Sequence, residues 1–216
     1  MTPAAGRRSV APLQCGHDAP SIYLASASPR RRELLEQIGI PHAVLLAPAP
    51  EGEDEPRLPG ESPASYVLRT AREKCARGVQ WMRSQAMPER PVLAADTTVI
   101  LGQDILGKPQ DADQATAMLR RLSGGVHEVR TAVVVCWDGE SAEAVNTTRV
   151  WMAELDDVQI ARYVASGEPF GKAGGYGIQG LAGSFVSRLE GSYTGVMGLP
   201  LYETAQLLGL AGIVRP

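Results

Sequence analysis

Apolar residues recur at helical spacing after two Ser-Pro pairs in the first half of the chain. A serine can cap the first amides of a helix, and proline is favoured in the first helical turn. The first apolar stripe stops at Gly39 and the second near Ser84. The pattern therefore predicts one helix from Pro29 to Gly39 and a longer helix from Pro63 to about Ser84.

Runs rich in β-branched and apolar residues predict strands between and after these helices. The predicted strands cover residues 21–25, 43–46, 91–101, 126–136, 144–153 and 184–189. Three further helices are expected, one capped by Asp111 or Asp113, one opening at Asp156 and Asp157, and one starting near Pro200. Strands that alternate with helices indicate an α/β fold, and the hairpin-like neighbours predict a mixed sheet.

The composition is typical of one globular domain. The chain has 216 residues, of which 44% are hydrophobic and 21% charged, and this length favours a single domain with two lobes. Residues 1–20 are rich in Ala, Pro, Gly and Arg, so we expect a disordered leader there and the domain over 21–216. The sequence shows neither an apolar run of membrane-spanning length nor an export signal, and we expect no membrane partner.

The net charge bears on which molecules the protein binds, and the cysteine content bears on its cellular compartment. The formal net charge is -3 at pH 7, whereas a protein that binds nucleic acid irrespective of sequence normally has a basic surface. We therefore expect no nucleic-acid partner and only local recognition of phosphate. Cys15, Cys75 and Cys136 are widely spaced, which argues against a zinc site and favours a reducing cytoplasm.

The segment GQDILGKP at residues 102–109 matches the spacing of a phosphate-binding P-loop except at its last position. A P-loop has Ser or Thr after the lysine, whereas Pro109 offers neither a hydroxyl nor an amide N–H. We interpret the match as accidental. Lys108 follows a strand that carries Asp96, and it is either a cation of the same cleft or a solvated lysine on a turn.

Arg30, Arg31 and Arg32 occupy the first turn of the first predicted helix, where the helix dipole is already positive. Ser26, the free amides of that turn and the guanidinium groups form a candidate anion site, because this geometry suits phosphate oxygens. The alternative is an exposed charged turn that tolerates the electrostatic cost.

Asp96 interrupts an apolar run where a buried strand is expected to reach the sheet edge. An unpaired buried carboxylate is costly, so Asp96 is either paired or functional. Glu55 lies in an acidic loop, where it is either solvated or the second carboxylate of a site that holds Mg²⁺ or Mn²⁺. Lys74 belongs either to that site or to an ordinary charged helix face.

Seven short motifs occur in one order, and the set is far more specific than any member. They are SASPRR at 26–31, DE at 54–55, AREK at 71–74, ADT at 95–97, GKP at 107–109, KAGGYGIQG at 172–180 and GLP at 198–200. The set resembles the Maf family of nucleoside triphosphate pyrophosphatases over residues 21–210. The segment at 172–180 resembles the branch of that family that acts on dTTP and UTP.

The resemblance implies a two-lobed α/β domain, similar to inosine triphosphatases, with an elongated mixed sheet, flanking helices and a central cleft. It implies hydrolysis of a nucleoside triphosphate between the α- and β-phosphates. Asp96 would accept the proton of the attacking water, and Asp96 with Glu55 would bind a divalent cation, Mg²⁺, Mn²⁺ or Co²⁺. The groups assigned to the triphosphate and its developing charge are Ser26, Arg30, Arg31, Lys74 and Lys108.

Arg30, Thr97 and Gln179 match family positions associated with the choice of substrate. The Gln179 amide can donate to O4 and accept from N3–H of uracil or thymine. The chain departs from the family pattern at Gly171, where an acidic residue is frequent, and at Gly175, where alanine is usual. These departures affect the base pocket and leave every assigned catalytic group in place.

Two functions fit these observations. One is a housekeeping pyrophosphatase that removes modified or excess pyrimidine nucleotides before they enter nucleic acid. The other is a nucleotide-binding regulator of cell division, since the family name refers to septum formation. The presence of both Asp96 and Glu55 favours the enzyme, because a binding module gains nothing from acids beside a polyanion. The resemblance also suggests a homodimer.

Overall fold

The computed structural model describes residues 20–48 and 55–213. The predicted leader therefore lies outside the described residues apart from Pro20, as do residues 51–54 of the acidic loop before Glu55. The prediction of disorder at the N-terminus stays a prediction.

Within the described residues, seven strands form one mixed sheet in the order β2-β1-β3-β5-β6-β7, with β4 paired to β3. Strand β1 is parallel to β2 and β3, and the other pairs are antiparallel. The strands are β1 (Ile22–Leu24), β2 (His42–Val44), β3 (Val92–Leu101), β4 (Asp104–Leu106), β5 (Val126–Trp137), β6 (Glu140–Met152) and β7 (Val186–Glu190). The α/β class and the mixed sheet are thus confirmed.

The helices follow the predicted order, with additions after β6. They are α1 (Pro29–Gln37), α2 (Pro63–Ser84), α3 (Ala112–Leu122), α4 (Asp157–Ala165), α5 (Tyr193–Met197) and α6 (Leu201–Leu210), with 3₁₀ turns η1 (Ala173–Gly175) and η2 (Leu181–Phe185). Caps explain several starts: Ser62 accepts from the Ser65 amide, Asp111 from Gln114, and Asp156 forms a capping box with Gln159.

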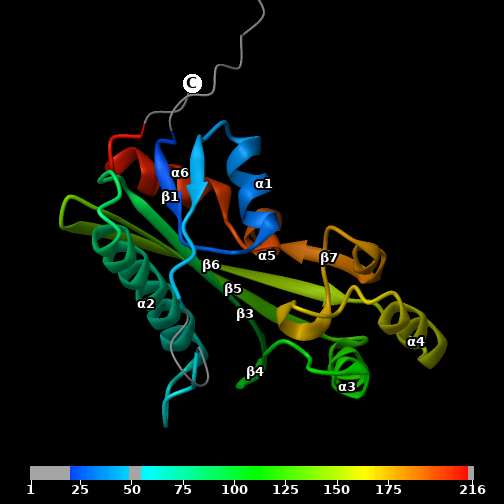
Figure 1. Cartoon of the computed structure of the whole chain (residues 1–216). Helices are drawn as coiled ribbons and strands as arrows, with labels where there is room; N and C mark the ends of the chain where they lie inside the picture. The colour runs from blue at the N-terminus through cyan, green and yellow to red at the C-terminus, as the bar shows by residue number, and fades with distance from the viewer. Residues whose placement is uncertain (1–19, 49–54, 214–216) are drawn as a thin grey trace, which may run out of the picture.

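Strands β3, β5 and β6 run through the length of the molecule and join two lobes (Figure 1). At one end, α2 packs on one sheet face through Val67, Ala71 and Cys75, and α1 and α6 pack on the other. At the other end, a third core cluster joins α3 and α4 to β5 and β6. The predicted two-lobed shape follows from these separate cores.

Alternation along β3 decides which side chains meet which helix. Val92 and Ala94 pack toward α2, whereas Leu93 and Ala95 pack toward α1 and α6. By the same period, Asp96 shares the face of α2 and Thr97 shares the face of α1. Two neighbouring residues therefore serve opposite faces of the sheet.

Strand β3 has an open stretch on the side away from β5. Its pairing with β1 ends at Leu93, and its pairing with β4 begins at Val99. Among the described residues, no strand pairs with that side over positions 94–98. We expected Asp96 where the strand reaches the sheet edge; it lies instead in the middle of β3, opposite Ala132 of β5, and beside a local gap.

One local prediction needs correction, and the structure adds two features that the sequence did not specify. Ser28 occupies the position before α1, but its side chain makes no capping bond, and its amide donates to Ser26 Oγ at 3.2 Å. The short helix α5 was not predicted, because a segment of five residues is too short to show a helical stripe. The glycine-rich segment at 174–180 contains a 3₁₀ turn in addition to a loop.

Candidate active site

A cleft of about 940 Å³ opens beside the gap in β3. This volume lies in the range of small-molecule sites. All of the predicted site residues line the cleft: Ser26, Arg30, Arg31, Glu55, Lys74, Asp96, Thr97, Lys108 and Gln179. Because the cleft passes the open edge of β3, side chains from both sheet faces reach it.

Lys74 lies between two carboxylates at the α2 side of the cleft. Its ammonium donates to Asp96 Oδ1 at 2.6 Å and also forms an ion pair with Glu55 Oε1. Among its neighbours on α2, Arg72 pairs with Glu143 on β6, outside the cleft, whereas Arg77 lines the cleft together with Lys74. Lys74 therefore belongs to the cleft and not to the outer charged face of the helix.

Asp96 is 5% exposed and ionised. Burial alone would raise its pKa, but the charge and hydrogen bond of Lys74, with the charge of Arg31, outweigh burial and hold the pKa below its usual value. Thr98 also donates to Oδ2 at 3.3 Å. The carboxylate is thus held as an anion whose oxygens point to the α2 side of the cleft.

Arg31 is fixed on the opposite side of β3 by three protein oxygens. Its Nε donates to the Gly198 carbonyl at 2.8 Å, and its two terminal nitrogens donate to Ser26 Oγ at 3.0 Å and Thr97 Oγ1 at 3.3 Å. Burial lowers the pKa of Arg31, and the attraction of Asp96 opposes that shift. The guanidinium is therefore a preorganised charge, and Ser26 is one of the groups that hold it.

Arg30 points to the same wall of the cleft. Its Nε donates to the Met197 carbonyl at 3.3 Å, and burial lowers its pKa while Glu33 opposes the change. The carbonyls of Met197 and Gly198 come from the end of α5, where Gly198 adopts a left-handed conformation with φ of 116°. The short helix that the sequence did not predict thus positions both arginines.

The segment that resembled a P-loop is a strand hairpin. Gly102 and Gln103 form the turn between β3 and β4, and β4 runs antiparallel to β3. No helix begins at Lys108, whose exposed side chain lines the cleft. The neighbouring Gly107 carbonyl accepts from the Gly174 amide at 2.9 Å, so this strand end is tied to the glycine-rich segment.

Gln179 reaches the cleft from the glycine-rich segment and is exposed. Gly174 has a φ of 70° and packs against Val99, where an added Cβ would lie 2.9 Å from a valine carbon. Tyr176 is buried, and its hydroxyl contacts His127 Nε2 at 2.7 Å. The segment is therefore packed closely on the sheet, with Gln179 at its solvent side.

The two carboxylates suit a hard divalent cation. Asp96 and Glu55 both contact the Lys74 ammonium, so one small cation is within reach of both. Mg²⁺ is commonly held by one or two carboxylates together with waters and substrate phosphates. A group of three or more metal-ligating side chains is absent from the described residues. The donor set thus fits a cation that is completed by substrate and water.

Several residues that line the cleft were not predicted as site residues. Those with polar side chains include Tyr66 and Arg77 of α2 and Lys172 of the glycine-rich segment. The ammonium of Lys172 donates to the Glu168 carbonyl, and burial lowers its pKa, with Arg30 adding to the shift. Lys172 belongs to the KAGG motif, and that motif was the available signal.

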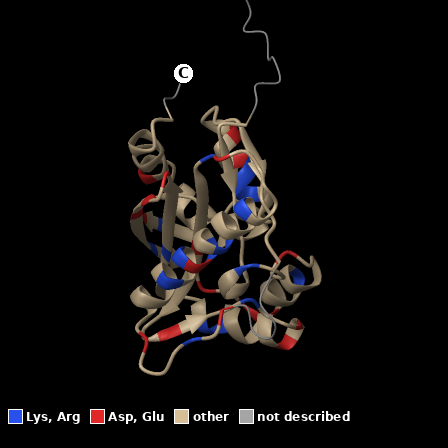
Figure 2. Ribbon diagram, turned by 60° about the vertical axis from the view of Figure 1, so that its left-hand side comes forward, with Lys and Arg blue, Asp and Glu red and all other residues tan. Residues whose placement is uncertain are grey.

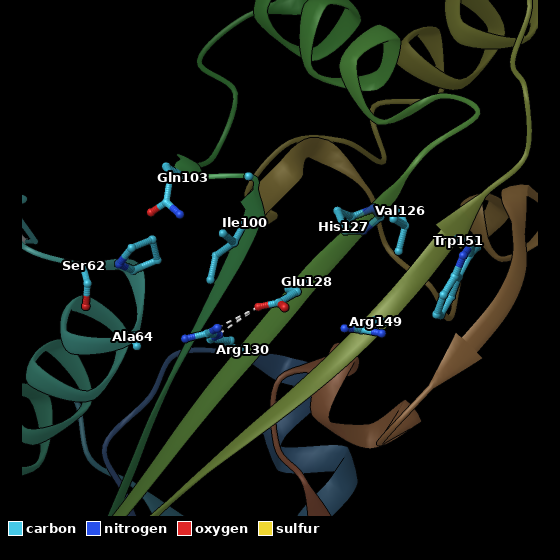
Figure 3. A pocket seen from close by; sticks show the side chains of 12 residues that line it. Ser62, Ala64, Ile100, Gln103, Val126, His127, Glu128, Arg130, Arg149 and Trp151 are labelled. Carbon is cyan, nitrogen blue, oxygen red and sulfur yellow. Dashed lines mark hydrogen bonds and ion pairs between the residues drawn. The ribbon is translucent and has the colours of Figure 1, made fainter.

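A second pocket of about 610 Å³ lies between the start of α2 and strands β3, β5 and β6. Figure 3 shows Arg130 bonded to Glu128 at its floor, with Arg149 and Trp151 on β6. None of the predicted site residues lines this pocket. Of its two arginines, Arg130 is paired with Glu128, and the pocket brings together fewer cationic side chains than the cleft.

The surface beyond the cleft carries mixed charge. Figure 2 shows Lys and Arg segments interspersed with Asp and Glu segments along the ribbon. A helix suited to spanning a membrane is not found in the described part of the chain. The cleft itself is lined by six cationic side chains and two carboxylates: Arg30, Arg31, Lys74, Arg77, Lys108 and Lys172, with Glu55 and Asp96.

Comparisons with known proteins confirm the family resemblance. The sequence model of a family described as Maf-like protein matches residues 21–211. The chain is 62% identical over 197 residues to a dTTP/UTP pyrophosphatase of Bordetella avium, covering 91% of this chain and 98% of the relative. A relative with the same name from Ralstonia nicotianae is 53% identical over 197 residues, covering 90% and 95%.

The search of solved structures matches the Ham1 protein of Staphylococcus aureus with a TM-score of 0.39 and 14% identity, over 62% of this chain and 72% of that chain. A similarity of this size carries no argument about the chain.

Proposed function

The chain belongs to the Maf-like protein family, and from that premise we propose that it is a pyrophosphatase that hydrolyses dTTP and UTP to the nucleoside monophosphate and pyrophosphate. The observation that carries the proposal is the pair of carboxylates on Lys74, which lies in a cleft with Arg30, Arg31 and Lys108. The names of relatives at 62% and 53% identity support the two substrates.

The proposed chemistry needs a base for water and cations for the phosphates. Asp96 is ionised, so its carboxylate can accept a hydrogen bond from the attacking water and take its proton. Arg31 needs little reorganisation, because protein oxygens already fix its guanidinium. Preorganised charges of this kind stabilise the charge that develops in phosphoryl transfer.

A divalent cation bound by Asp96 and Glu55 would neutralise phosphate charge and acidify a water molecule. Lys74 already contacts both carboxylates, and its ammonium can remain with them or turn to a phosphate oxygen. Lys108, exposed at the cleft, is suited to the outer phosphates. We propose Mg²⁺, Mn²⁺ or Co²⁺ as the cation.

We assign selection of the base first to Gln179, on the glycine-rich segment. The Gln179 amide can complement O4 and N3–H of uracil or thymine, a pattern that cytosine does not present. Arg30 and Thr97 line the same cleft and complete the proposed selective set. The expected role is the removal of non-standard or excess pyrimidine nucleotides. A purely regulatory role in cell division is not favoured.

The location and assembly remain part of the proposal. Cys75 and Cys136 are free thiols, which agrees with a reducing cytoplasm. We expect a homodimer, and light scattering of the purified protein tests that expectation.

The deciding experiment measures pyrophosphate release from dTTP, UTP, CTP, dCTP, GTP, ATP and 7-methyl-GTP, with Mg²⁺ or Mn²⁺. The control pair is Asp96→Asn in the cleft and Asp104→Asn on β4, where Asp104 pairs with Arg121 outside the cleft. We expect dTTP and UTP to lead, Asp96→Asn to be inactive and Asp104→Asn to be active. If 7-methyl-GTP were hydrolysed fastest, the substrate assignment would be wrong. If dTTP bound but no nucleotide were cleaved, the proposal that the protein is an enzyme would be wrong.

A further inference from the structure

The carboxylate of Glu168 gathers three hydrogen bonds behind the glycine-rich segment. Glu168 lies between α4 and η1 and is absent from the residues that line the cleft. Its Oε1 accepts from the Tyr163 hydroxyl at 2.9 Å and from the Ala182 amide at 3.4 Å, and its Oε2 accepts from the Leu181 amide at 2.9 Å. A half-buried carboxylate thus holds parts of the chain on both sides of the segment.

These bonds bracket Gln179. Leu181, two residues after it, is bonded directly to the carboxylate. Gly177, two residues before it, donates from its amide to the Tyr163 hydroxyl at 3.2 Å, and that hydroxyl donates to Glu168. Burial, together with this bond, raises the pKa of Tyr163, so the hydroxyl stays a donor. Gln179 is therefore anchored from both directions to one carboxylate.

The packing is as close as the hydrogen bonding. An added Cβ at Gly180, the residue after Gln179, would lie 2.4 Å from Glu168 Oε2. At Gly177 an added Cβ would lie 2.8 Å from Cε of Lys172, whose ammonium is held by the Glu168 carbonyl. The carboxylate therefore fills the space behind the backbone that carries Gln179.

We propose that Glu168 is a positioning residue for pyrimidine selection, which acts by fixing the segment that presents Gln179 without itself touching the nucleotide. This inference rests on the proposed function. A contact to the base made equally in the ground and transition states affects KM more than kcat. Loss of Glu168 should therefore weaken discrimination between UTP and CTP and leave the turnover of bound nucleotide nearly unchanged.

The test compares Glu168→Gln and Tyr163→Phe with the wild type, using kcat and KM for UTP and CTP. Glutamine keeps the size of the side chain but loses one acceptor, and phenylalanine removes the hydroxyl that links Gly177 to the carboxylate. We expect the UTP to CTP ratio of kcat/KM to fall by about tenfold in Glu168→Gln, through KM for UTP, and by less in Tyr163→Phe. Glu190→Gln, which alters an exposed ion pair on β7, is the matched control.

Amide hydrogen exchange supplies a readout that does not depend on activity. Exchange at residues 177–182 should become faster in Glu168→Gln, while exchange in β3 stays as in the wild type. The inference is overturned if the wild type cleaves UTP but the variants keep the wild-type UTP to CTP ratio of kcat/KM and the wild-type exchange rates at residues 177–182. A wild type without hydrolysis overturns the proposed function, and the exchange data then decide whether Glu168 fixes the segment.

A separate observation concerns two thiols that the sequence placed far apart. Cys75 of α2 is buried, Cys136 of β5 is half-buried, and their sulfur atoms lie 2.9 Å apart. The Cys75 thiol donates to Cys136, which lowers the pKa of Cys136, while the same bond and burial raise the pKa of Cys75. The more exposed sulfur is therefore the better nucleophile.

The geometry points to an intramolecular disulfide between Cys75 and Cys136 that forms under a peroxide oxidant. The Cys136 thiolate attacks a peroxide oxygen and becomes a sulfenic acid with release of water, and Cys75 then displaces a second water to form the bond. Closing the sulfur atoms to about 2.0 Å moves α2 by roughly an ångström, and Lys74 adjoins Cys75. We expect a reversible loss of activity.

The test treats the full chain with hydrogen peroxide and then with dithiothreitol, and maps the disulfide by mass spectrometry of non-reduced peptides. The expected result is a Cys75–Cys136 linked peptide and at least a fivefold fall in dTTP hydrolysis that dithiothreitol restores, consistent with the sensitivity of catalysis to small displacements. The Cys136→Ser variant should resist inactivation by peroxide. The control variant Cys15→Ser, which keeps both proposed partners, should be inactivated like the wild type. The proposal is overturned if peroxide oxidises the protein without forming the Cys75–Cys136 peptide. It is also overturned if the disulfide forms and hydrolysis of dTTP is unchanged.

Discussion

At one end of the cleft, Asp96 and Lys74 come from the interiors of a long strand and a long helix, whereas at the other end Gln179 stands on a glycine-rich segment held from behind by Glu168. The first end carries the charged side chains that we propose for the triphosphate, a group that every nucleoside triphosphate has. The second end presents an amide to a base. If the proposed roles hold, turnover and selection rest on separate supports, and substitutions should affect one without the other.

The largest expected effect is at the phosphate end. Asp96→Asn should lower kcat for dTTP and UTP alike by about 10³-fold, because it removes the proposed proton acceptor. The base ratio should stay unchanged. Single-turnover pyrophosphate release measures the rate, and an Asp96→Asn enzyme with wild-type kcat would contradict the role of Asp96.

The second largest expected effect is a pH-dependent loss of stability through His127, which contacts Tyr176 of the glycine-rich segment. His127 is 3% exposed, and burial lowers its pKa from 6.5 to about 4. The unfolded chain takes up a proton near pH 6.5, whereas the folded protein resists until about pH 4, so the unfolding free energy falls as pH drops through this window. The loss should reach about 3 kcal/mol.

Urea unfolding from about pH 7 to about pH 4 measures this loss. His127→Gln should flatten the profile relative to the wild type, because the buried imidazole is gone. Equal slopes in the two proteins would show that other groups cause the pH dependence.

A smaller effect is expected at Gln179. Gln179→Glu should reduce the UTP to CTP ratio of kcat/KM by about tenfold, since a carboxylate cannot donate to O4 of the pyrimidine. The turnover number for UTP should change little. Competition assays with both nucleotides measure the ratio directly, and retained pyrimidine selectivity would reject the proposed amide contact.

The smallest effect is expected at Lys108. Its exposed ammonium is screened by water, so Lys108→Ala should raise KM for dTTP by about threefold at low salt and by less at high salt. A fall in kcat instead would place Lys108 among the groups that act in the transition state, as the family resemblance implies.

The fold was largely predictable where local signals are strong. Ser62, Asp111 and Asp156 mark helix starts that the structure confirms, and the apolar stripe of α2 matches its buried face. The failures have physical causes. Helix α5 is too short to show a period, and the place of Asp96 within β3 depends on where β1 leaves the sheet, which is a tertiary property.

The candidate site was predictable as a set of residues but not as an arrangement. The motifs named Lys74, Glu55 and Asp96 separately, whereas only the fold shows that one ammonium contacts both acids. The support given by Glu168 could not be predicted, because its partners Tyr163 and Leu181 belong to different elements. Sequence separation likewise hid the contact between the two thiols.

The gap in β3 also bears on self-association. A strand edge without a partner offers amide and carbonyl groups to a strand of another molecule, which is a common start of aggregation. Asp96 within the gap, Lys74 above it and Arg31 on the other side place charges around this edge. An incoming apolar strand would have to strip water from those charges, so the charges proposed for turnover should also disfavour strand pairing at this edge.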